Sequence, residues 1–167
     1  MIRDNNGAVT HYIAMHSDIT THKQAEDKIR MLAFFDHLTN LPNRRLLLDR
    51  LKQAMMASSR SQKYGALLFI DLDNFKTLND TLGHAMGDLL LKQVAQRMTT
   101  CIRTEDTVAR LGGDEFVVML VNLSLNKEEA AIQTEVVGKK ILRNLMTSTI
   151  FRTTSHAVSA LRCLMII

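Results

Sequence analysis

The sequence contains no tryptophan, a single proline and two cysteines, Cys101 and Cys163, which lie far apart and form no CxxC pair. This cysteine usage gives no basis for a disulfide framework or a zinc site and suits a reducing compartment. The sequence also lacks an apolar run of the roughly 20 residues that cross a bilayer, and no signal-peptide pattern opens it. We therefore expect a soluble, cytoplasmic protein with no membrane segment in this chain.

Acidic residues are absent from the last part of the chain. Residues 136–167 hold five basic side chains, which leaves 16 bases against 17 acids in residues 1–135, so the net charge of +4 is a property of the tail. Aromatic residues make up 5% of the chain, and few side chains could therefore stack on nucleobases. These two observations argue against a nucleic-acid binder. Hydrophobic residues make up 46% of the 167 residues, which is enough for a folded core.

The first 35 residues predict a short hairpin followed by a helix. In "IRDNNGAVTHYIAMHSDIT", Asn5, Asn6 and Gly7 supply turn chemistry between stretches of alternating apolar residues. From Thr21 to about Phe35, apolar residues recur at helical spacing on a mostly charged segment. Such a stripe suits a connecting helix that pairs with a second copy of itself.

The rest of the chain predicts one α/β domain. Apolar residues recur at helical spacing in residues 41–58, 88–102 and 127–145. "GALLFIDLD" is an apolar run that ends in acids and predicts a buried central strand, and "TVARLGGDEFVVML" predicts a hairpin. This order of elements indicates an α/β fold, an α+β sandwich in which helices flank a mixed, mainly antiparallel central sheet.

The predicted hairpin carries two glycines and two acids at its tip. Gly112 and Gly113 favour a tight turn that brings the backbone close to a ligand, because glycine adopts positive φ at little cost. Asp114 and Glu115 are then held rigidly beside the turn. If the hairpin pairs with the strand that ends at Asp71, Asp114 can face Asp71, and the two carboxylates would form a Mg²⁺ site for phosphates. The alternative is a solvated turn, since glycine and aspartate are ordinary turn residues.

Three separated stretches carry a resemblance to a known family. "FFDHLTNLPNRR", "DLDNFKTLNDTLGHAMGD" and "RLGGDEF" closely resemble, in order and spacing, the GGDEF domain of the diguanylate cyclase family. Members of this family condense two GTP into cyclic di-GMP and two pyrophosphates. The resemblance covers most of residues 34–147. It implies a fold similar to nucleotide cyclases and polymerase palm domains, an active site at the β-hairpin, and a homodimer in which each subunit brings one GTP.

The resemblance implies a role for several acidic and basic side chains. Asp71, Asp114 and the backbone carbonyl of Leu72 would hold Mg²⁺ or Mn²⁺ through hard oxygen ligands. Asp114 or Glu115 would help deprotonate the 3′-hydroxyl of GTP. Lys76 would neutralise charge on the departing pyrophosphate.

Guanine recognition is implied for Asn79 and Asp88. A carboxylate accepts from both N1–H and the exocyclic amine of guanine, which adenine cannot satisfy, and an amide can bridge to the remaining edge of the base. The structural alternatives are a turn residue for Asn79 and a helix cap for Asp88.

Three further side chains near these positions also have structural alternatives. Asp73 either supports the metal site or forms a local salt bridge. Lys76 is otherwise a solvated surface lysine. His84 matches a family position near the nucleotide, and a structural or solvated histidine is its alternative.

"RTED" lies at the offset from the glycines where many family members carry an RxxD inhibitory site for their own product. In this sequence the pair is Arg103 and Asp106. Arginine grips phosphate and the guanine edge in a planar fork, and aspartate accepts from guanine, so the pair would bind cyclic di-GMP as a feedback inhibitor. The alternative is a surface ion pair.

The two ends of the chain give further expectations. Residues 1–20 resemble the C-terminal end of a PAS sensor domain with "DIT" as its exit motif, and residues 21–35 would be the signalling linker helix. Residues 36–167 would be a GGDEF domain that is incomplete at its C-terminus. The reason is that "HAVSALRCLMII" departs from the family's "SIGIA" strand and its following phosphate-binding helix. We therefore expect a chain truncated at both ends, without one edge of the sheet.

Two functional classes stay open on the sequence. The first is a metal-dependent diguanylate cyclase that is the signalling output of a sensor protein and works as a homodimer on GTP. The second is a catalytically weak GGDEF module that binds GTP or cyclic di-GMP and regulates a neighbouring domain. The style of "LPNRRLLLDRLKQA" is also similar to GGDEF domains that precede an EAL phosphodiesterase domain. No nucleic-acid partner is expected.

Overall fold

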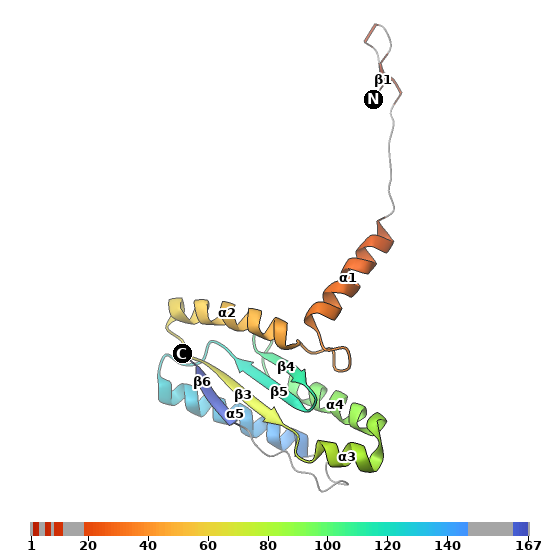
Figure 1. Cartoon of the computed structure of the whole chain (residues 1–167). Coiled ribbons are helices and arrows are strands. Elements are labelled where there is room, and N and C mark those ends of the chain that lie inside the picture. Colours follow the sequence, from red (N-terminus) through yellow and green to blue (C-terminus); the bar gives the residue numbers. More distant parts are fainter. Residues whose placement is uncertain (1, 4–5, 8, 12–18, 147–161, 167) are drawn as a thin grey trace. The chain divides into compact units, whose positions relative to one another are not determined.

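The computed structural model describes residues 2–3, 6–7, 9–11, 19–146 and 162–166 (Figure 1). The chain divides into two compact units, Met1–Met31 and Leu32–Ile167. In the first unit, β1 (Ile2–Arg3) and β2 (Val9–His11) pair antiparallel, which confirms the predicted hairpin over these residues. The predicted strand character of Tyr12, Ile13 and Met15 falls outside the described residues. Helix α1 (Thr20–Phe34) begins in the first unit and ends in the second, close to the predicted helix.

The second unit is built on a sheet of order β4-β5-β3-β6 in which every neighbouring pair is antiparallel. The strands are β3 (Gly65–Asp71), β4 (Thr107–Gly112), β5 (Glu115–Leu120) and β6 (Arg162–Ile166). The helices are α2 (Arg44–Ser61), α3 (Phe75–Leu82), α4 (His84–Thr99) and α5 (Lys127–Met146). This confirms the predicted class of a mainly antiparallel sheet flanked by helices, and the described strands include no parallel pair.

Alternation along the strands divides the core between two faces of the sheet. On one face, Leu67 of β3 belongs to a small cluster with Leu47 of α2. On the other face, Leu68 and Ile70 belong to the main core, to which α4 and α5 contribute buried side chains. In α5, the predicted inward stripe is confirmed, since Ala130, Thr134 and Ile141 are buried and Val137 packs against them. The fold is therefore a three-layer helix–sheet–helix arrangement.

Helix α2 begins where the sequence predicts. Asn43 is its N-cap, and the side-chain oxygen accepts hydrogen bonds from the backbone N–H of Arg45 and Leu46 at 3.0 and 3.1 Å. Such a cap satisfies backbone donors that the first turn of a helix leaves unpaired. Helix α2 ends at Ser61, and its C-cap is Gln62, a left-handed residue with φ of 59°.

The expectation that one edge of the sheet is missing is wrong. Strand β6 pairs with β3 from Gly65↔Ile166 to Phe69↔Arg162 and forms that edge. A short apolar run such as "CLMI" can pair beside a buried strand whether or not it matches a family motif. The first part of "HAVSALRCLMII", the segment that departs from the family's strand, lies outside the described residues.

Helix α3 is an element that the sequence pattern did not predict. It begins after Asn74, a left-handed residue with φ of 56°, and ends at Leu82, with Gly83 as its C-cap at φ of 83°. Gly83 then directly precedes α4, so the two helices are separated by one residue.

In the described part of the chain, no helix is both long enough and apolar enough to span a membrane.

Candidate active site

The strand register brings acids of β3 and β5 together at one end of the sheet. Asp71, the last residue of β3, pairs with Glu115, the first residue of β5. Asp71 lies in the same alternating row of β3 as Leu67 and Phe69, and its side chain is exposed. The predicted acidic site requires that the hairpin pair with this strand, and this pairing is confirmed.

The turn between β4 and β5 is shifted by one residue from the prediction. Gly112 is still paired, with Glu115, so the two turn residues are Gly113 and Asp114 rather than the two glycines. The cause is an irregularity in the β4–β5 register between Arg110 and Gly112. Gly112 has φ of 146° and Gly113 has φ of 52°, and a Cβ on either would meet no atom within 4 Å. Backbone conformation, and not lack of space, therefore requires glycine here.

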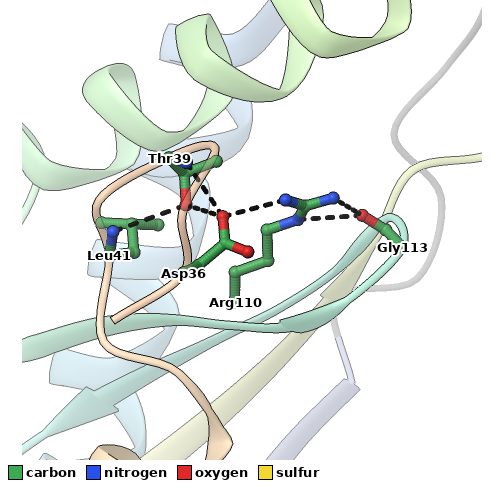
Figure 2. A network of polar contacts seen from close by, with 5 residues as sticks. All are labelled: Asp36, Thr39, Leu41, Arg110 and Gly113. Atoms are coloured by element: carbon green, nitrogen blue, oxygen red, sulfur yellow. Dashed lines mark hydrogen bonds and ion pairs between the residues drawn. The ribbon is translucent and has the colours of Figure 1, made fainter. Parts of the chain in front are cut away.

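A buried arginine contacts this turn through its guanidinium group (Figure 2). Nε and Nη2 of Arg110 both donate to the carbonyl oxygen of Gly113, at 3.0 and 2.7 Å, while Nη1 donates to Oδ1 of Asp36 at 2.9 Å. Asp36 Oδ1 also accepts from the hydroxyl and the backbone N–H of Thr39, at 2.6 and 2.9 Å. We call these four residues the Arg110 network. It ties the segment after α1 to the acidic turn.

The sequence pattern did not identify the Arg110 network. Helix α1 ends at Phe34, and Asp36 lies in the turn that follows it. That turn runs beside β4, because the N–H of Arg110 donates to the carbonyl oxygen of Pro42 at 3.0 Å. The available signal was an arginine inside an otherwise apolar strand, since a charge at such a position needs a partner.

The pKa values of Asp114 and Asp36 are shifted in opposite directions. Burial raises the pKa of Asp114 above its ordinary value, and the negative charges of Asp71 and Glu115 raise it further, while a bond to its own backbone N–H and the charge of Arg110 only partly oppose this. For Asp36, burial acts upward, but the hydrogen bonds from Thr39 and Arg110 outweigh it and hold the pKa below 3.8. Asp114 is thus a carboxylate crowded by negative charge.

Such crowding is what a bound cation would relieve. The described residues contain no cluster of three or more His, Cys, Asp and Glu side chains suited to a metal, and the carboxylate of Asp71 is near enough to that of Asp114 to act on its pKa. The carbonyl oxygen of Leu72 accepts a long hydrogen bond of 3.3 Å from the N–H of Phe75 and keeps a second lone pair. Mg²⁺ commonly binds through one or two carboxylates and takes its other oxygens from water and phosphates. The donor set fits that cation.

Helices α3 and α4 carry the residues predicted to bind the base. Asn79 lies inside α3, so it is not a turn residue, and its Oδ1 is buried without a hydrogen-bond partner. Asp88 is exposed in α4, whose N-cap is Gly83, so the helix-cap alternative for Asp88 is wrong. His84 is the exposed first residue of α4.

The two remaining side chains are those of Lys76 and Asp73, close to the end of β3. Lys76 is exposed in the first turn of α3. Asp73 is half-buried between β3 and α3, and it forms no ion pair with any residue that the structure describes, which removes the local salt bridge as its explanation.

The RxxD pair forms one turn but not one ion pair. Asp106 accepts hydrogen bonds from the backbone N–H of Arg103 and of Val121, both at 3.1 Å. The Arg103 guanidinium lies 3.7 Å from the carboxylate of Glu105, and both side chains are exposed. The predicted alternative of an Arg103–Asp106 surface ion pair is therefore wrong. Asp106 also borders a cavity of about 350 Å³ between α2 and the sheet.

Comparison with known proteins shows the family to which this chain belongs. The sequence matches the family model described as "Diguanylate cyclase, GGDEF domain" over residues 33–160. The structure resembles that of the isolated GGDEF domain of TpbB from Pseudomonas aeruginosa, with a TM-score of 0.67 and 35% identity, covering 78% of this chain and 73% of that chain. The fold is thus the palm-like fold of nucleotide cyclases. The chain belongs to the GGDEF diguanylate cyclase family.

Curated relatives are longer proteins. The chain is 46% identical over 122 residues to the bifunctional diguanylate cyclase/cyclic di-GMP phosphodiesterase MucR of Pseudomonas aeruginosa, covering 73% of this chain and 18% of MucR. It is 39% identical over 118 residues to the cyclic di-GMP phosphodiesterase PdeR of Escherichia coli, covering 71% of this chain and 18% of PdeR. The chain thus spans less than a fifth of the length of either relative.

Proposed function

We propose that this chain is a diguanylate cyclase domain that condenses two GTP into cyclic di-GMP and two pyrophosphates. The observation that carries the proposal is the position of Asp114 in the turn beside the paired residues Asp71 and Glu115, where burial raises its pKa and the two neighbouring carboxylates raise it further. Convergent carboxylates on a tight turn suit metal-assisted phosphoryl chemistry. Membership of the GGDEF family supports the same reaction.

The metal site in this proposal consists of Asp71, Asp114 and the carbonyl oxygen of Leu72. A bound Mg²⁺ or Mn²⁺ would neutralise charge on the triphosphate. The protein's own part is to fix these oxygens, which the β3–β5 register and the Arg110 network do. Asp114 or Glu115 would accept the proton of the 3′-hydroxyl.

The substrate contacts follow from the elements that flank the turn. Gly112 and Gly113 expose backbone beside the acids, because neither has an atom near its missing Cβ. Lys76 would neutralise the departing pyrophosphate. Asn79 and Asp88 would select guanine, and His84, at the start of α4, would lie near the nucleotide.

We also propose the surroundings in which this domain works. Joining two GTP requires two nucleotide sites, so a homodimer is the active form. Residues 1–20 would be the end of a PAS sensor domain, and α1 would be the linker that pairs with its copy, since Ile29 and Leu32 are 67% and 66% exposed. An EAL domain in the parent protein is part of this proposal, as is a cytoplasmic location, where GTP is available. Arg103 and Asp106 would bind cyclic di-GMP as a feedback inhibitor.

A second function is a GGDEF module that binds GTP or cyclic di-GMP without turnover and regulates a neighbour. The observation in its favour is the 39% identity to PdeR, a protein named for phosphodiesterase activity. Incubation of the chain with GTP and Mg²⁺, followed by chromatography of the nucleotides, separates the two functions. Cyclic di-GMP in the products supports the cyclase. GTP that is bound but recovered intact supports the regulatory module.

A further inference from the structure

Gly87 of α4 faces Asn79 of α3 at an unusually close contact. A Cβ at position 87 would lie 2.0 Å from Oδ1 of Asn79 and 3.0 Å from its Cγ, and the same Oδ1 is buried without a hydrogen-bond partner. Real Cβ atoms do not approach a neighbour this closely. The Asn79 amide therefore occupies the space in which any other residue at position 87 would place its side chain.

Backbone conformation does not explain the glycine. Gly87 is buried within α4 and is not among the glycines with positive φ, which are Gly7, Gly83, Gly112 and Gly113. Glycine is the least favourable helix residue apart from proline, so a buried helical glycine needs a local reason. The reason here is room for the Asn79 amide.

The contact also sets the direction of that amide. A buried carbonyl oxygen without a partner is unfavourable, and Asn79 holds its Oδ1 in that state against Gly87. Oδ1 and Nδ2 branch from the same carbon, so an Oδ1 turned toward Gly87 directs Nδ2 away from it. An outward NH₂ group is a donor suited to the acceptor atoms of guanine, O6 and N7.

Phe75 limits the ways in which a side chain at position 87 could be accommodated. Its Cζ would lie 3.2 Å from a Cβ at position 87, and its ring packs against the main core. An added methyl group would thus be blocked by Phe75 and by Asn79 together. Because the ring is held by the core, the Asn79 side chain is the group that must rotate.

We propose that Gly87 is a positioning residue that determines nucleotide specificity by making room for the Asn79 amide, next to the carboxylate of Asp88. The inference rests on the proposed function and adds to it a residue that never touches the base. Gly87→Ala should rotate Asn79 out of place and reduce the preference for guanine, while the triphosphate contacts at the β4–β5 turn stay intact.

The test is calorimetry on the full chain with Mg²⁺ and three probes: α,β-methylene GTP, α,β-methylene ATP and inorganic tripolyphosphate. The first two cannot release pyrophosphate, so binding is measured without turnover. Gly87→Ala should lower the guanine-over-adenine preference about tenfold, the effect of one misplaced hydrogen-bonding group, and leave tripolyphosphate affinity unchanged. Met86→Ala, at the neighbouring position of α4, should leave all three affinities unchanged.

A double-variant comparison shows whether Gly87 acts through Asn79. In an Asn79→Ala background the amide is gone and only the contact with Phe75 remains, so Gly87→Ala should change the preference no further and should lower the melting temperature less than it does in the wild type. The proposal is overturned if Gly87→Ala keeps the wild-type preference, or if it weakens tripolyphosphate binding as much as guanine binding. A wild-type chain that prefers neither nucleotide contradicts the proposed function itself, which is a different result.

Discussion

Asp36 and Arg110 lie 74 residues apart in the sequence and meet in an ion pair of 2.9 Å between Oδ1 and Nη1, with 16% and 9% of their side chains exposed. The same guanidinium holds the carbonyl oxygen of Gly113 in the acidic turn. The position of the turn thus depends on the segment that follows α1.

Removing the charge of Asp36 should destabilise the domain. Asp36→Asn leaves the buried guanidinium without its ion-pair partner, and we expect a loss of about 1–3 kcal/mol in the free energy of unfolding, measured by urea denaturation at pH 7. The matched control is Glu135→Gln, which breaks the exposed pair of Glu135 and Lys139 and should change stability by less than about 0.5 kcal/mol. Equal effects of both variants would show that the Arg110 network has no special weight.

The contribution of Asp36 should depend on pH in a defined direction. Its folded-state pKa is lowered below 3.8, so its stabilising effect is present above the unfolded-state pKa and is lost as the pH falls through the folded value. The stability difference between the wild type and Asp36→Asn should therefore be constant near neutral pH and shrink below about pH 4. A difference that persists undiminished in acid would contradict the assigned pKa.

Asp114 should behave in the opposite way. Its folded-state pKa is raised, so the stability it contributes is present below the unfolded-state pKa and is lost as the pH rises through the folded value. At pH 7 without divalent cations, Asp114→Asn should therefore raise the melting temperature, on the order of 2 °C. Mg²⁺ with nucleotide should stabilise the wild type and not the variant, as measured by differential scanning fluorimetry. A variant that melts below the metal-free wild type would refute the crowding of negative charge at the turn.

Gly112, the last residue of β4, and Gly113, in the turn, should differ in their tolerance of substitution. Gly112, with φ of 146°, occupies a region that side chains rarely enter, whereas Gly113, with φ of 52°, lies in the left-handed region that asparagine tolerates. Gly112→Asn should cost about 1–3 kcal/mol of stability, and Gly113→Asn should cost less than about 1 kcal/mol. Urea denaturation of both variants measures the difference, and a larger loss for Gly113→Asn would argue against the assigned turn.

The RxxD residues should separate into a structural and a binding part. Asp106→Ala removes the acceptor of two backbone N–H groups and should cost about 1–3 kcal/mol of stability. Arg103→Ala should leave stability within about 0.5 kcal/mol, because its side chain is 72% exposed, and should abolish binding of cyclic di-GMP in a titration. Glu105→Gln is the control for the ion pair with Arg103. Unchanged product binding by Arg103→Ala would remove the inhibitory site.

Local patterns were sufficient to predict much of the fold. β3, the acidic hairpin and α5 follow from an apolar run, turn residues and helical periodicity, and each lies where the sequence places it. Helix α3 was missed because "FKTLNDTL" has few apolar residues and depends on the core contacts of Leu78 and Phe75. β6 was missed because its pairing partner, β3, is almost 100 residues away in the sequence, and only the tertiary fold brings them together.

The sequence also predicted a part of the candidate site. The meeting of Asp71 with the hairpin acids follows from strand register, which alternation of side chains specifies. The exact turn residues do not follow, because the register irregularity near Leu111 shifts the turn by one position. The Arg110 network depends on contacts between elements that are distant in the sequence, which no local spacing reveals. The contact of Gly87 with Asn79 depends on how α4 packs against α3, a helix that the sequence pattern did not predict.

The most direct test of the account is the stoichiometry of GTP turnover by the wild-type chain with Mg²⁺, compared with Asp114→Asn and with Asp80→Asn, an exposed aspartate on α3 outside the proposed site. Cyclic di-GMP and pyrophosphate are quantified over time. The account predicts two pyrophosphates for each cyclic di-GMP in the wild type and in Asp80→Asn, and a rate lower by at least about 100-fold in Asp114→Asn. Wild-type turnover that survives unchanged in Asp114→Asn would contradict it.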